Sequence, residues 1–113
     1  MSLDVYLMVT KPCEVYHSNI THNLGKMASA VELSNGKTLY DVLWRPDEHG
    51  YIKASHITSL LHEGMSELIR WPEKYTEYNP KNNWGSYDGL VDFVREYHMA
   101  CSDNPDAELD ISR

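Results

Sequence analysis

The sequence feature that most constrains the fold is an amphipathic segment at residues 54–70. Its apolar residues recur at spacings of three and four, the period of an α-helix with one buried face. They are Ile57, Leu60, Leu61, Met65, Leu68 and Ile69. An isolated helix of this length gains most of its stability from packing, so the segment requires further elements to cover its apolar face.

Further segments also have a helical pattern. Residues 87–101 carry one apolar stripe, and Ser86 before them is suited to cap the helix. The stripe consists of Leu90, Val94, Tyr97 and Cys101. Residues 38–46 predict a shorter helix that begins with a Thr38–Asp41 capping-box pattern and ends at Pro46. One or two helical turns are predicted at 72–78.

Strand-type patterns lie at the two ends of the chain. Residues 3–9 and 13–17 are rich in Val, Leu and Tyr, and Pro12 between them favours a hairpin. Residues 107–113 alternate weakly and suit an edge strand beside the first one. The sequence therefore predicts an α+β fold in one domain, residues 1–113. A small antiparallel sheet of two or three strands would pack against three or four helices.

The stretch HSNITHNLGKM at 17–27 also fits a helical period from Ser18 to Val31. On that helix, Asn19, His22, Asn23 and Lys26 would form one polar stripe without a carboxylate. Such a stripe near a helix N-terminus suits an anion such as phosphate. The alternative is a solvated helix face on which Asn19 serves as the cap.

Two tryptophans lie beside groups that suit recognition of a base and a phosphate. Trp44 precedes Arg45, and Trp84 lies among amides in NPKNNWGSYDG. The alternative is that both indoles are packing anchors. The predicted ligand-binding residues are thus Asn19, His22, Asn23, Lys26, Trp44, Arg45 and Trp84.

No motif predicts a metal, a cofactor or a catalytic residue. The six histidines include no pair at helical ligand spacing, and neither HExxH nor GxSxG occurs. Catalysis therefore stays an open alternative, although no motif assigns its residues. Cys13 and Cys101 form no CxxC pair; we expect a buried free thiol at Cys101, while their pairing stays open.

The charge balance limits the classes of partner. Seventeen acidic and ten basic side chains give a net charge of −7, which argues against nucleic-acid binding through a basic field. The N-terminus does not resemble a signal peptide, and no apolar run reaches membrane length. We therefore expect a cytoplasmic protein without a membrane partner. Homo-oligomerisation would help so small a core, but the sequence leaves it open.

Three segments together resemble a family of small phage, prophage and bacterial proteins. They are NITHNLGKM, LYDVLWRP and NPKNNWGSYDGLVDFV, and the ends MSLDVYL and ELDISR extend the resemblance over nearly the whole chain. The polar positions that the family shares map onto Asn19, Thr21, His22, Asn23, Trp44, Arg45, Trp84 and Gly85. The resemblance implies a phage accessory protein in a host cytoplasm, but no particular reaction.

Three functional hypotheses follow. The first is a non-catalytic protein that binds a small phosphate-bearing, nucleotide-like ligand in host interaction or counter-defence. The second is an inhibitor that binds a host protein through an acidic, Tyr-rich surface, which predicts an exposed aromatic patch rimmed by carboxylates. The third is a small enzyme that uses His22, which needs a second titratable group within hydrogen-bond reach.

Overall fold

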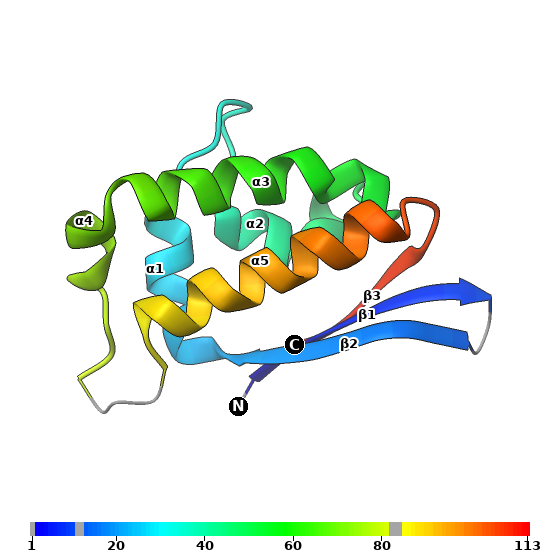
Figure 1. The fold of residues 1–113 in the computed structure, drawn as a ribbon, viewed down its shortest axis with the longest axis horizontal. Helices are drawn as coiled ribbons and strands as arrows, with labels where there is room; N and C mark the ends of the chain where they lie inside the picture. The colour runs from blue at the N-terminus through cyan, green and yellow to red at the C-terminus, as the bar shows by residue number, and fades with distance from the viewer. Residues whose placement is uncertain (1, 11–12, 82–84) are drawn as a thin grey trace.

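The computed structural model describes residues 2–10, 13–81 and 85–113 (Figure 1). In chain order the elements are β1 (Ser2–Thr10), β2 (Cys13–Thr21), η1 (His22–Leu24), α1 (Gly25–Ala30), α2 (Leu39–Trp44), η2 (Pro46–His49), α3 (Ala54–Arg70), α4 (Pro72–Thr76), α5 (Tyr87–Asp103) and β3 (Glu108–Ser112), where η marks a 3-10 helix. The predicted α+β class is confirmed.

The sheet has three antiparallel strands in the order β2-β1-β3, so that β1 is central and β2 and β3 form the edges. The N-terminal hairpin and the C-terminal edge strand are therefore confirmed. Leu3, Val5 and Leu7 of β1 point inward and are fully buried. The helices lie on this inner side of the sheet, as Figure 1 shows.

The core lies between the sheet and the helices. α5 packs over β2, and α3 packs against α5 (Figure 1). The predicted stripe of α5 is fully buried, including the free thiol of Cys101. α2 approaches α3 closely at Gly64, where a Cβ would lie 2.7 Å from Cδ1 of Leu39. In the described ranges, no helix combines the length and apolarity needed to cross a membrane.

The helix predicted to begin at Ser18 is wrong in its first turn. β2 continues to Thr21, because residues 18–21 pair in register with the start of β1. The Thr21 hydroxyl then accepts a hydrogen bond from the Asn23 N–H at 3.3 Å, which opens η1. α1 begins only at Gly25. Ile20 is buried in the strand, and a helix with this apolar spacing would also require it to be buried. The spacing from Ile20 to Leu24 therefore could not distinguish a strand from a helix.

Candidate functional site

The outer face of the sheet gathers acidic and aromatic side chains. Successive strand residues point to opposite faces, so Asp4, Tyr6 and Met8 of β1 point away from the buried residues between them. In the same order, their register partners are Asn19, His17 and Glu14 on β2, and Ser112, Asp110 and Glu108 on β3. Since directly paired residues share a face, strands from both ends of the chain build one surface.

An aromatic pair occupies the middle of this face. The rings of Tyr6 and His17 stack with their centroids 4.5 Å apart and an interplanar angle of 7°. His17 Nε2 lies 3.3 Å from Oδ1 of Asp4, and its Nδ1 lies 4.0 Å from Oε1 of Glu14. The His17 side chain is 43% exposed, so the stack is accessible from solvent.

The remaining carboxylates of the face come from β3. Asp110 is the register partner of Tyr6 on the side opposite His17, and Glu108 is the partner of Met8. Both side chains are exposed. An aromatic ring surrounded by carboxylates suits a cationic group, through contact with the ring face and hydrogen bonds to carboxylate oxygens. We call Asp4, Tyr6, Glu14, His17, Glu108 and Asp110 the acidic sheet face.

His22 and Trp44, two of the predicted ligand residues, lie together in a different place. Trp44 is only 2% exposed, stacks on Tyr40 with centroids 5.2 Å apart and meets the His22 ring edge-on at 6.2 Å. Trp44 therefore lies in the core and serves as a packing anchor, as the alternative interpretation of the sequence expects. His22 Nε2 is buried and has no hydrogen-bond partner among the described residues. The enzyme hypothesis requires a second titratable group within hydrogen-bond reach of His22, and no described residue offers one to Nε2.

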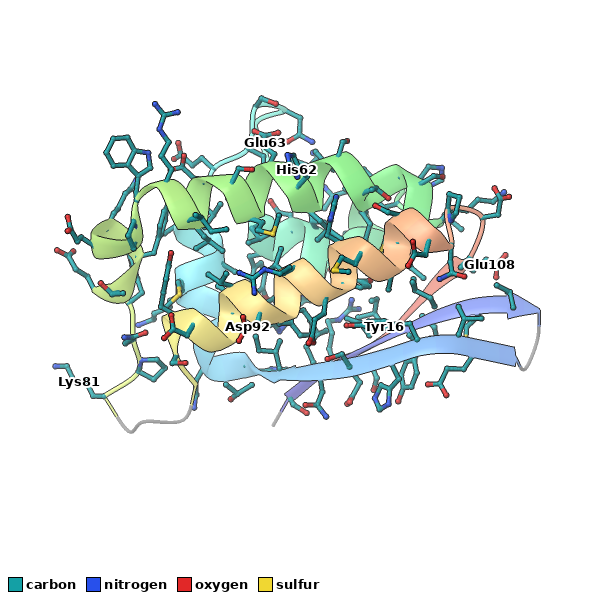
Figure 2. All side chains as sticks on the ribbon, viewed as in Figure 1. Tyr16, His62, Glu63, Lys81, Asp92 and Glu108 are labelled. Carbon is teal, nitrogen blue, oxygen red and sulfur yellow. The ribbon has the colours of Figure 1, made fainter. Side chains whose placement is uncertain are left out.

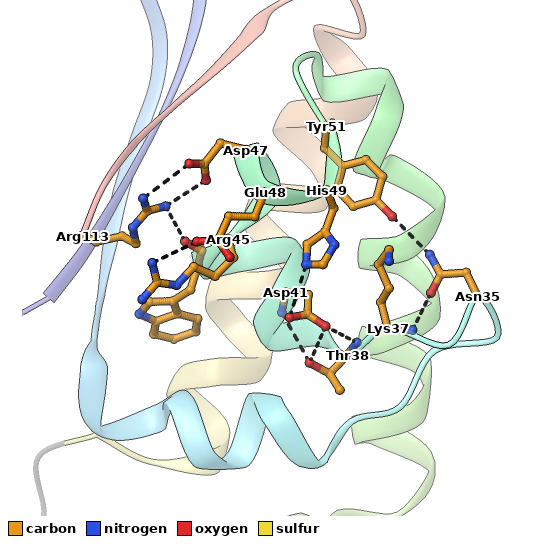
Figure 3. A network of polar contacts seen from close by, with 11 residues as sticks. Asn35, Lys37, Thr38, Asp41, Arg45, Asp47, Glu48, His49, Tyr51 and Arg113 are labelled. Atoms are coloured by element: carbon orange, nitrogen blue, oxygen red, sulfur yellow. Dashed lines mark hydrogen bonds and ion pairs between the residues drawn. The ribbon is translucent and has the colours of Figure 1, made fainter.

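Arg45 follows Trp44 and is neutralised locally (Figure 3). Its Nη1 lies 3.1 Å from Oε2 of Glu48, and its pKa is raised, chiefly by a hydrogen bond to Tyr40 and less by Glu48. The neighbouring Arg113 donates to the Trp44 carbonyl at 2.9 Å and to Asp47 Oδ1 at 2.8 Å. The hydrogen bond from Arg113 lowers the pKa of Asp47. An anion at Arg45 would therefore have to compete with Glu48.

The other predicted ligand residues are not united by a helix. Asn19 lies on β2, in register with Asp4 on the outer face of the sheet, whereas His22 and Asn23 lie in η1. Lys26 is exposed on α1 and forms no ion pair within the described part of the chain. The predicted stripe at helical spacing is therefore wrong, since Asn19 is not helical. Trp84 lies outside the described residues.

The acidic, Tyr-rich surface expected from the sequence had no assigned residues, and the acidic sheet face contains one tyrosine, Tyr6. The alternation in β1 would have identified Asp4 and Tyr6 as outward-facing. The register with β3 could not be read from the sequence, because it joins residues about 100 positions apart along the chain. Of the residues described, no group of three or more His, Cys, Asp or Glu side chains is arranged to hold a metal ion.

Comparison of the chain with protein-family models, with curated proteins and with solved structures finds no match. A function must therefore be argued from the sheet face and its chemistry.

Proposed function

We propose that this protein is a non-catalytic binding domain whose acidic sheet face holds a basic segment of a partner protein. The observation that carries the proposal is the accessible Tyr6–His17 stack with carboxylates on both sides. This arrangement has the aromatic patch and the carboxylate rim expected for the inhibitor hypothesis. In a phage setting, which the resemblance implies, the partner would be a host protein.

Charge and geometry support a cationic partner. The face carries four carboxylates, from Asp4, Glu14, Glu108 and Asp110, and the β1–β2 and β1–β3 register pairs that form it include no Lys or Arg. The exposed Lys53, which forms an isolated bridge with Glu108, lies at the edge of the face. Charge complementarity of this kind accelerates encounter and selects against acidic partners. A Lys or Arg side chain could lie over the Tyr6 ring while its charged group contacts Asp4 or Asp110.

A direct test uses a Lys–Arg hexapeptide as the probe. We expect its binding to shift the backbone amide resonances of Tyr6, His17 and Asp110. The double variant Asp4→Asn/Asp110→Asn should weaken binding about three- to tenfold, since an exposed ion pair contributes roughly 0.2–1 kcal/mol. The control Glu73→Gln/Glu77→Gln removes the same charge from exposed residues at α4. Equal weakening by both pairs would show attraction to net charge alone and overturn the proposal.

A second candidate function, binding of a small phosphate-bearing ligand, is favoured by the buried and unpartnered Nε2 of His22. Buried polar atoms without a partner are rare, and a ligand would supply one. A ligand at a hundred times its dissociation constant adds about 2.7 kcal/mol of stability. Inorganic phosphate, nucleotides and cyclic dinucleotides should therefore be screened by thermal shift. A shift that His22→Gln abolishes and His98→Gln retains would support this function, and no shift would exclude it.

A further inference from the structure

A groove of about 350 Å³ lies between the edge strand β2 and helix α5. Residues 18–21 of β2 form one wall, and Gly89, Asp92 and Glu96 of α5 belong to the opposite wall. Figure 2 labels Asp92 on the part of α5 that runs above β2. The groove is distinct from the acidic sheet face, because it opens between the strand and the helix.

The strand wall of the groove is formed by the edge of β2 itself. Four consecutive residues line it, although neighbouring side chains point to opposite faces of a sheet. Ile20 is 7% exposed and points inward, whereas Asn19 is exposed on the outer face. What these residues share is the backbone edge. β2 has a strand neighbour on one side only, so this edge offers N–H and C=O groups to an added strand.

The helix wall leaves room for an extended chain. Gly89, Asp92 and Glu96 are spaced by three and four residues and therefore lie on one face of α5. Gly89 contributes no side chain. Gly85, which also lines the groove, lies so close to β2 that a Cβ would be 2.7 Å from Cγ2 of Thr21. The helix wall thus lacks a side chain at Gly89, and the backbone at Gly85 packs directly against β2.

The charge of the groove favours a basic occupant. Its lining residues include the carboxylates of Asp92 and Glu96 but no Lys or Arg. Asp92 is already paired with Arg95, whose Nη1 lies 2.8 Å from Asp92 Oδ1. Glu96 forms no salt bridge with any residue in the described ranges. A cationic side chain of an occupant would therefore find its partner in Glu96.

We propose that an extended segment of a partner protein adds to the edge of β2 in this groove as a further strand and places a Lys or Arg side chain against Glu96. Main-chain hydrogen bonds to the strand edge supply affinity in this mode of recognition, and alternate side chains supply specificity. The proposal uses a surface other than the acidic sheet face, so either can fail without the other.

The test uses the capped peptide Val-Lys-Val-Lys-Val and two analogues, one with Glu for Lys and one N-methylated at every backbone amide, which blocks both edges of the extended peptide. We expect the Lys peptide to shift the amide resonances of residues 18–21 and Gly89, and both analogues to bind at least tenfold more weakly. Equal binding of the N-methylated analogue would overturn strand addition. Shifts confined to Tyr6 and His17 would assign the peptide to the sheet face and also overturn it.

Two variants test the walls of the groove separately. Gly89→Leu adds bulk to the helix wall and should weaken the Lys peptide at least fivefold. Glu96→Gln removes the charge without adding bulk and should weaken it about two- to fivefold, the range of an exposed ion pair. Asp103→Asn, at the far end of α5, is the matched control and should have no effect. Sedimentation of the free protein tests the other possible occupant of the groove, a second copy of this chain. A dimer that the peptide dissociates would show that the groove binds a second copy and would contradict the proposal.

Discussion

At the scale of single residues, Gly85 before α5 and Gly89 in its first turn should respond differently to alanine. Gly85 has a φ of +107°, and a Cβ there would contact Thr21 at 2.7 Å, whereas Gly89 is helical and its Cβ would meet Ser86 Oγ at 3.3 Å. We expect Gly85→Ala to lower the free energy of unfolding by at least about 1 kcal/mol. Gly89→Ala gains helix propensity but presses its Cβ on Ser86 Oγ, which caps α5, so its effect should be smaller than that of Gly85→Ala. Urea unfolding of both variants checks this, and equal destabilisation would contradict it.

A second prediction at this scale concerns the thiol of Cys101. The side chain is fully buried, and burial raises its pKa to about 12. Because the thiolate is the reactive form, Cys101 should resist iodoacetamide at pH 8 while the chain is folded. A Cys13→Ser background leaves it as the sole cysteine. Mass spectrometry should show alkylation in urea and none in buffer; rapid alkylation in buffer would contradict the buried position.

At the scale of elements, the sequence predicts long amphipathic segments better than short ones. The bounds of α3 match the predicted 54–70, because a stripe of many turns has only one periodic interpretation. The predicted helix start at Ser18 is wrong, because residues 18–21 continue β2 and α1 begins only at Gly25. Ser18 and Asn19 can cap a helix or continue a strand, and only the pairing of β2 with β1, which is tertiary, selects the strand. The helix-based ligand stripe depended on that local assignment.

The capping box of α2 gives a prediction with a defined pH dependence. Thr38 Oγ1 accepts from the Asp41 N–H, and Asp41 accepts from the Thr38 N–H (Figure 3). Burial raises the pKa of Asp41, but hydrogen bonds from Thr38 and the nearby His49 outweigh it, so the pKa is lowered overall. This stabilisation is therefore present above the pKa of the unfolded chain and is lost as the pH falls through the folded pKa.

We expect Asp41→Asn to lower the free energy of unfolding by roughly 0.5–1 kcal/mol at pH 7. The difference from the parent chain should shrink as the pH falls below about 4. Urea unfolding between pH 3 and pH 7 measures it. A difference that stays constant over this range would show that the Asp41 charge contributes nothing to the cap.

At the scale of the whole molecule, the sequence shows how much charge the chain carries but not where it gathers. The net charge of −7 is visible at once. The acidic sheet face exists only because β3 returns from the end of α5 to pair with β1, which sets Asp110 beside Tyr6. Side chains that are scattered along the chain thus become neighbours in space, and no local pattern encodes their distances.

This gathering of like charge predicts opposite effects of salt on stability and on binding. Raising the ionic strength from 0.01 M to 0.15 M shortens the screening length from about 30 Å to about 8 Å. Repulsion among the carboxylates of the sheet face weakens, so the melting temperature should rise. The Lys–Arg hexapeptide should bind more weakly over the same series, since its attraction is screened as well.

The variant Asp4→Asn/Asp110→Asn should flatten the salt dependence of both the melting temperature and the binding. Thermal melts and titrations in matched buffers measure the two dependences. A melting temperature that falls with salt would mean that ion pairs such as Arg113–Asp47 outweigh the repulsion, and would contradict this view of the face.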